Sequence, residues 1–159
     1  MSAADVVLAL ILAVHVVAAT LWAGALFFEQ VLLPKVTSPG AIAVPLRGAS
    51  VEAQRWGSLA AVLTGVIWVG VVEASKYGVG YFRSSAFAAV AVGGGLATLM
   101  ALNTWTVVWP AHRRAMALHP GDASGPEFAA EVRRFALASR LNLVATFTVT
   151  AFVVFGGEL

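Results

Sequence analysis

The chain has 159 residues, of which 60% are hydrophobic and only 11% are charged. A soluble domain needs about a quarter of its residues charged, so this composition predicts an integral membrane protein. The sequence contains no cysteine, which excludes disulfides, thiolate metal sites, iron–sulfur clusters and covalent c-type haem attachment within the chain. The net charge of +2 does not indicate nucleic-acid binding, because the basic residues flank apolar segments, where membrane topology explains them.

Four segments are long and apolar enough to be membrane-spanning helices: residues 6–33, 56–72, 86–109 and 137–155. We expect Pro34 to end the first of them, because proline disfavours helical geometry in the residue before it. Ser124 and Glu127 have the spacing of a capping box, which predicts a helix that starts there and runs unbroken into the last segment. The first apolar run is longer than the hydrophobic part of a signal peptide and lacks preceding basic residues, so we expect it to remain as a helix. The sequence predicts an all-α, four-helix membrane bundle in which residues 1–159 form one domain.

The loops predict how this bundle is oriented. Residues 35–55 contain two prolines and two glycines, so we expect an irregular or only briefly helical first loop. Basic residues are far more frequent in or beside the first and third loops than in the second, where only Lys76 and Arg83 occur. Those of the first and third loops are Lys35, Arg47, Arg55, Arg113, Arg114, Arg133, Arg134 and Arg140. Because basic residues concentrate on the cytoplasmic side, we expect both termini to lie outside.

The first segment contains His15, an ionisable residue that is costly in hydrocarbon unless it binds or pairs with something. Successive steps of seven residues place Trp22 and Glu29 on the same stripe of the helix. His15 should lie roughly 14 Å below the outer end of this helix, at 1.5 Å per residue. Four glycines are expected at similar depths on the second and third helices: Gly65, Gly93, Gly94 and Gly95.

These glycines have two interpretations. They can allow close helix packing, or they can leave a flat slot in which a porphyrin lies beside His15. For His15 itself, axial ligation of haem b, a structural or proton-relay role and binding of another metal all stay open, and haem ligation is the leading hypothesis. Met100 lies within a turn or two of the depth needed for a second axial ligand, although a lone methionine in an apolar helix more commonly packs. We expect Trp22 to form a wall of the cofactor site.

A second group of polar residues gathers toward the expected cytoplasmic side: Glu29, Arg55, Asn103, Trp109, His112, Arg140 and Asn142. Arginines at helix starts are commonly topology anchors, and the polar seam of Ser139, Asn142, Thr146 and Thr150 can simply join helices by hydrogen bonds. The alternative is a pocket for haem propionates, a quinone or a small anion, with Arg55 and Arg140 as donors and Glu29 paired with them. Arg55, Asn103, Arg140 and Asn142 are therefore expected cofactor-binding residues. His112 and His119 are expected in solvent or among headgroups.

Four blocks of sequence carry a family resemblance: HVVAATLWAG, RWGSLAAVLTG, NTWTVVWP and ASRLN. In this order they resemble the N-terminal membrane domain of cytochrome-c-linked bacterial urate oxidases. The first block is also similar to the bacterial four-helix protoporphyrinogen oxidase, but the tryptophan–proline and ASRLN blocks do not belong to that family. The urate oxidase resemblance gives weight to His15, Trp22, Gly24, Arg55, Trp56, Asn103, Trp105, Trp109, Pro110, Ser139, Arg140 and Asn142.

The resemblance implies a redox role in a bacterial inner membrane, with a cytochrome or a quinone as possible redox partner. The chain departs from the family by ending after four helices without a cytochrome c domain. It also has Ala111 and His112 after the tryptophan–proline pair, where the family tends to have asparagine and glutamine. Urate specificity therefore does not transfer, and the shorter length implies that two copies pair as a homodimer.

The leading functional hypothesis is a membrane b-type haem protein for electron transfer or oxidoreduction of a small substrate. Whether it is an enzyme stays open, with a haem-dependent oxidoreductase favoured. One alternative is a proton-coupled transporter without a cofactor, using His15 and Glu29 as titrating groups. Another is an anchor subunit that binds a soluble redox partner through its basic loops.

Overall fold

The computed structural model describes residues 3–36, 43–73, 78–122 and 125–155, and in these residues the chain is all-α. The first helical rod comprises α1 (Ala3–Phe27), a π-helical turn η1 (Phe28–Leu32) and α2 (Leu33–Val36). The second comprises α3 (Ala43–Ile67) and the π-helical turn η2 (Trp68–Glu73). The third follows a 3₁₀ turn, η3 (Val79–Arg83), and comprises α5 (Ser85–Asn103), the π-helical turn η4 (Thr104–Val108) and α6 (Trp109–Asp122). The fourth is α7 (Pro126–Phe155).

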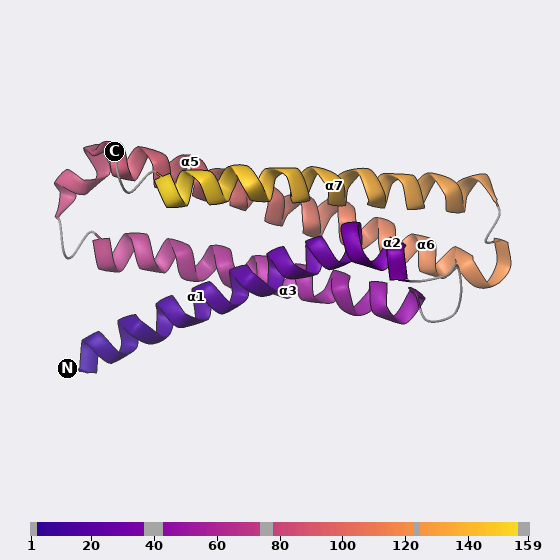
Figure 1. Cartoon of the computed structure of the whole chain (residues 1–159), viewed down its shortest axis with the longest axis horizontal. Helices are drawn as coiled ribbons and strands as arrows, with labels where there is room; N and C mark the ends of the chain where they lie inside the picture. The colour runs from indigo at the N-terminus through magenta and orange to yellow at the C-terminus, as the bar shows by residue number, and fades with distance from the viewer. Residues whose placement is uncertain (1–2, 37–42, 74–77, 123–124, 156–159) are drawn as a thin grey trace.

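The four rods form an elongated bundle (Figure 1). The first rod packs chiefly on α3, and α7 packs chiefly on α5 and α6. The first turn of α1 and the last turn of α7 lie at the same end of the bundle, and α1 diverges from the other rods toward that end (Figure 1). The predicted all-α, four-helix architecture is confirmed.

Three of the helices are long and apolar enough to cross a membrane over their described residues: Asp5–Lys35, Ser85–Leu118 and Pro126–Phe152. Large apolar side chains such as Val66, Leu141 and Phe147 are 65–69% exposed, which suits contact with lipid tails rather than water. The chain is therefore a multi-pass membrane protein. The segment 56–72 is helical but is not among the three spans; the first half of its helix carries several charged residues. That this helix also crosses, and that both termini lie outside, stay predictions.

The first rod does not end at Pro34, so this prediction is wrong: the helix continues to Val36. Proline in an α-helix lacks an N–H donor, and its ring collides with the carbonyl four residues earlier. That carbonyl belongs to Gln30, within the π-helical turn η1, where the Leu33 N–H bonds to the Phe28 carbonyl five residues back. The wider turn accommodates the proline without ending the helix.

The same arrangement recurs at Pro110, where the third predicted segment was expected to stop. The turn η4 precedes this proline, with the Trp109 N–H bonded to the Thr104 carbonyl, and the helix continues to Asp122. The hydroxyls of Thr104 and Thr106 donate to the carbonyls four residues earlier, at 2.9 and 2.8 Å. The expected third loop is thus helical over most of its length, and its first residues stay within the bundle.

The other helix boundaries follow local chemistry. The second helix starts at Ala43 rather than near Trp56, so the prediction of an irregular first loop is wrong from residue 43 onward. Pro45 lies in the first turn of that helix, where no backbone N–H is needed. The Ser84 side chain caps α5 by accepting the Phe87 N–H at 3.1 Å. The fourth helix is unbroken from Pro126, as predicted, whereas Ser124 of the expected capping box lies outside the described residues.

Two clusters of buried apolar side chains join the rods. The first is Ala18, Trp22, Leu26, Ala61, Met100 and Ala101, and the second is Val51, Val108, Ala111, Phe135 and Ala138. Gly57 lets α1 and α3 approach closely, because a Cβ there would lie 3.2 Å from the Ala18 carbonyl oxygen and 3.3 Å from the Trp22 Cβ.

A polar network joins α5 and η4 to α7 in the middle of the bundle. Asn142 is only 2% exposed. Its Nδ2 donates to the Thr104 hydroxyl at 2.9 Å and to the Met100 carbonyl at 3.1 Å, and its Oδ1 accepts from Asn103 Nδ2 at 2.8 Å. Asn103 also donates to the Ala138 carbonyl at 3.0 Å. In a membrane, such a network replaces the water that would otherwise satisfy these groups.

Replacing Asn142 with alanine should lower the free energy of unfolding by about 1–2 kcal/mol, because three buried hydrogen bonds are lost together. Unfolding by denaturing detergent in mixed micelles, followed by circular dichroism, measures this change. Thr106→Ala is the matched control, since its exposed hydroxyl bonds only within its own helix, and it should cost less than about 0.5 kcal/mol. Equal effects of the two variants would contradict a stabilising role for the network.

Candidate ligand-binding site

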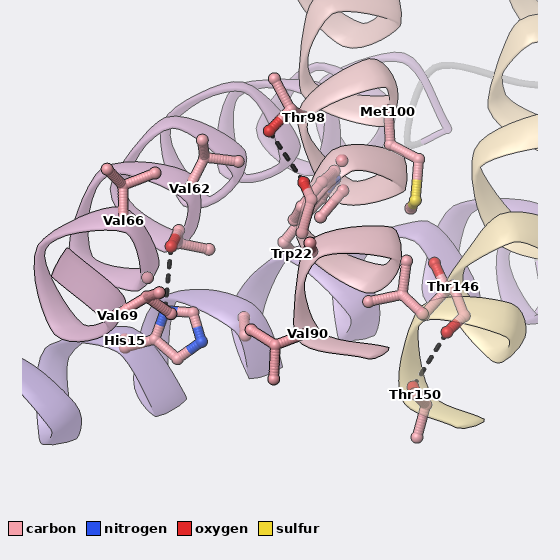
Figure 2. Close-up of a pocket in the computed structure, with 18 of the residues that line it drawn as sticks. His15, Trp22, Val62, Val66, Val69, Val90, Thr98, Met100, Thr146 and Thr150 are labelled. Atoms are coloured by element: carbon pink, nitrogen blue, oxygen red, sulfur yellow. Dashed lines mark hydrogen bonds between the residues drawn. The ribbon is translucent and has the colours of Figure 1, made fainter. Parts of the chain in front are cut away.

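A cavity of about 660 Å³ lies between α1, α3, α5 and α7. Its lining is mostly apolar and includes His15, Trp22, Gly65, Gly94, Gly95 and Met100. Figure 2 shows His15 and Met100 well apart along it, with Val90 on the side toward which His15 points. A largely apolar cavity with a small number of polar groups is the usual form of a small-molecule or cofactor site.

The His15 ring is held by one nitrogen and free at the other. Its Nδ1 lies 2.9 Å from the Ala61 carbonyl oxygen and 3.2 Å from the Thr64 hydroxyl. A carbonyl oxygen can only accept, so Nδ1 carries the proton and donates it to Ala61, which leaves Nε2 of the neutral ring with its lone pair. Nε2 has no hydrogen-bond partner among the described residues, and Figure 2 shows the ring projecting into the cavity.

Four glycines line the cavity, and three of them, Gly65, Gly94 and Gly95, were singled out in the sequence. A Cβ at Gly65 would lie only 3.0 Å from His15 Cε1, so the missing side chain gives the imidazole its place. A Cβ at Gly94 or Gly95 would meet no other atom within 4 Å, so these two glycines face open space. Gly93 is buried and does not line the cavity. The expected slot beside His15 is therefore present in part, with Gly65, Gly94 and Gly95 as its small residues.

Aromatic rings close the cavity near the start of α5. Phe82 and Phe87 line it, with their centroids 5.1 Å apart, and Tyr81 packs against Phe87 at 5.6 Å. Gly78, at φ +70°, permits the turn from which the 3₁₀ helix η3 with Tyr81 and Phe82 begins. Threonine hydroxyls supply most of the remaining polarity, but Thr98 and Thr150 already donate to the Gly94 and Thr146 backbone carbonyls (Figure 2).

Besides Gly93, four polar residues expected to bind a cofactor lie outside the cavity lining: Arg55, Asn103, Arg140 and Asn142. Asn103 and Asn142 belong to the interhelical network, and Arg140 is exposed on α7. The sequence expectation of one polar pocket holding all of these residues therefore does not match their placement, because their partners come from different neighbouring helices.

Arg55 is enclosed by tryptophans rather than by a ligand pocket. Its guanidinium carbon lies 4.7, 4.4 and 4.2 Å from the ring centroids of Trp56, Trp105 and Trp109. The Trp105 indole N–H donates to the Arg55 carbonyl at 3.2 Å, and the Trp109 indole N–H donates to Glu52 at 3.0 Å. Glu52 in turn forms an ion pair with Arg55 at 3.4 Å. This arginine–tryptophan cage, Arg55, Trp56, Trp105 and Trp109, joins α3 to the third rod.

The sequence predicted that Glu29 pairs with arginine, but no such ion pair is present among the described residues. The Gln54 Nε2 and the Gln30 Nε2 donate to its two carboxyl oxygens, and the side chain is only 2% exposed. His112, expected in solvent, is also buried at 9% exposure, with its ring 5.6 Å from that of Phe135. The continuation of the helix through Pro110 keeps His112 inside the bundle. The His119 side chain lies outside the described residues.

The sequence did not predict the hydrogen-bond partners of His15 or of Glu29. Ala61 and Thr64 stand one turn and one residue before Gly65, but an alanine carbonyl gives no signal in a sequence. Gln54 was detectable as a polar residue next to Arg55, and Gln30 as the neighbour of Glu29. Comparisons of the chain with known protein families, with curated proteins and with solved structures found no match.

Arg55→Gln should lower the free energy of unfolding by about 1–3 kcal/mol, because the variant loses the cation that three tryptophan rings surround. Arg134→Gln, at an exposed position on α7, should change it by less than about 0.5 kcal/mol. Detergent unfolding compares the two variants. A fully stable Arg55→Gln protein that loses a cavity ligand would instead support the cofactor role expected from the sequence.

Proposed function

We propose that the chain is a membrane b-type haem protein in which His15 Nε2 would bind the iron. The single observation that carries the proposal is the fixed His15 ring, with Nδ1 donating to the Ala61 carbonyl and Nε2 free in the cavity. Metal-binding histidines typically make this second hydrogen bond, which sets the tautomer and the orientation of the ring. Ligation would also offset the cost of keeping an imidazole in a membrane helix.

The remaining lining suits a flat, largely apolar group. Gly65 makes room for the His15 ring, and the open space in front of Gly94 and Gly95 leaves area for a macrocycle. Trp22 forms a wall that is only 6% exposed. Among the residues that the structure describes, no lysine or arginine lines the cavity, so propionates would have to reach its rim. Arg83 follows the lining residue Phe82, is exposed and has no ion-pair partner among the described residues, which makes it the candidate for that contact.

Haem bound here would supply one-electron chemistry, and the role we propose is electron transfer or oxidoreduction of a small substrate. The chain's own residues would orient the ligating imidazole through Ala61 and exclude water with the apolar lining and the aromatic rings of Phe82 and Phe87. A cytochrome or quinone partner and a bacterial inner membrane complete the proposal, and they rest on the sequence resemblance alone.

His15→Ala should abolish haem binding. The wild-type chain, expressed with added haem and purified in detergent, is expected to give a Soret band and a positive pyridine haemochrome assay, and the variant should give neither. His112→Ala is the control, because this buried histidine lies away from the cavity and should leave the spectrum unchanged. A colourless wild-type protein would reject the haem proposal, and an unaltered spectrum in His15→Ala would reject His15 as the ligand.

Gly94→Leu should block the cavity while leaving the fold intact, because its Cβ meets no protein atom within 4 Å. We expect at least a tenfold loss of haem per chain with no loss of helicity by circular dichroism. Gly24→Leu is the matched control: its Cβ also meets nothing within 4 Å, but Gly24 does not line the cavity. Equal haem content in the two variants would mean that the cavity is not the binding site.

A further inference from the structure

Glu29 is a buried carboxyl group in a membrane-spanning helix, and the proposed haem site does not use it. It is 2% exposed and lies in the π-helical turn η1. Its partners are two side-chain amides, Gln30 at 2.8 Å and Gln54, which is itself fully buried. An ionised carboxylate in such a place is costly, because neutral amides offset only part of its lost hydration.

No basic side chain neutralises Glu29 within ion-pair distance in the part of the chain that the structure describes. Arg47 of α3 is close enough to interact with it electrostatically but forms no ion pair with it. The other charged groups on the elements packed against η1 come from four helices. They are Asp5 of α1, exposed Lys35 of α2, the paired Glu52 and Arg55 of α3, and Glu127, Glu131, Arg133, Arg134 and Arg140 of α7, of which Glu131 pairs with Arg114. His112 of α6 also lies within electrostatic range of Arg47. A proton is therefore the simplest means of neutralising Glu29.

The geometry of Gln54 fits a protonated partner. Gln54 Nε2 donates to Glu29 Oε2 between α3 and η1. The Gln54 Oε1 atom is buried and has no donor. Rotating the terminal amide by half a turn would exchange the two atoms, so that Oε1 accepts a proton-bearing carboxyl oxygen of Glu29. Gln54 can thus serve either protonation state without any backbone movement.

We propose that Glu29 is a proton-binding site, with Gln54 as the partner that donates to the carboxylate and accepts from the carboxylic acid. Proton uptake converts the carboxylate to the neutral acid and requires no other reactant. The site lies fourteen residues from His15 on the same helix, about 21 Å along its axis, and the fully buried Leu26 stands between them. It is therefore separate from the cavity and does not depend on what the cavity binds.

Infrared spectroscopy of the full chain in phosphatidylcholine nanodiscs tests this proposal. At neutral pH the wild type should show the C=O stretching band of a protonated carboxylic acid. Glu29→Gln, which keeps the shape of the side chain, should lose this band, whereas Glu52→Gln, which removes an exposed carboxylate from α3, should retain it. Gln54→Leu should shift the band to higher frequency, because the acid then loses its hydrogen-bond acceptor. His15→Ala should leave it unchanged, which separates this result from that of the haem proposal.

Three outcomes would overturn the proposal: no such band in the wild type, a band that persists in Glu29→Gln, or a band that Gln54→Leu leaves in place. If Glu29→Gln fails to fold, as judged by circular dichroism, the wild-type and Gln54→Leu spectra still show whether a protonated carboxyl group lies beside Gln54. Exchange of choline chloride for sodium chloride distinguishes a site that binds a metal cation from a site that binds a proton. A sodium-dependent rise in thermal stability that Glu29→Gln abolishes would assign the site to sodium instead of a proton.

Discussion

Hydrocarbon offers no hydrogen-bond partners, so every polar group within the bundle must find one in the protein, and this constraint organises the structure. The two prolines inside the long rods illustrate it. Each would leave a carbonyl without a donor, and each is preceded by a π-helical turn that redirects the local hydrogen bonds. The rods therefore continue past Pro34 and Pro110, and the residues beyond remain part of the bundle.

The bundle has two chemically different halves. Toward the first turn of α1, the helices diverge and leave an apolar cavity with one free imidazole nitrogen. Toward the π-helical turns η1 and η4, the interior contains buried polar side chains beside the second apolar cluster: Glu29, Gln54, Thr104, Ser139 and Asn142. Gln54 and Ser139 each retain one buried polar atom without a partner, so this half holds hydrogen-bonding capacity that its packing leaves unused.

The sequence was sufficient to predict the architecture because the four apolar segments are long and their composition is unambiguous. It also singled out His15 and Gly65, which the structure brings into contact. Helix ends at Pro34 and Pro110 were mispredicted, because the rule that proline ends a helix holds only when no π-helical turn precedes it. The partners of Arg55 and Glu29 were mispredicted for a different reason. Arg55 pairs with Glu52 of its own helix and lies among tryptophan rings, and neutral amides rather than arginines contact Glu29.

His15, Trp22 and Glu29 lie on one stripe of the first rod, and this stripe connects the two halves. Leu26 and Trp22 are 0% and 6% exposed, so packed apolar side chains occupy the stripe between His15 and Glu29. At about 21 Å, two unit charges interact by roughly 0.8 kcal/mol at an effective dielectric constant of 20. The proposed haem and proton sites would therefore influence each other weakly through the electric field, and any stronger coupling would require the π-helical turn or α1 to change its position.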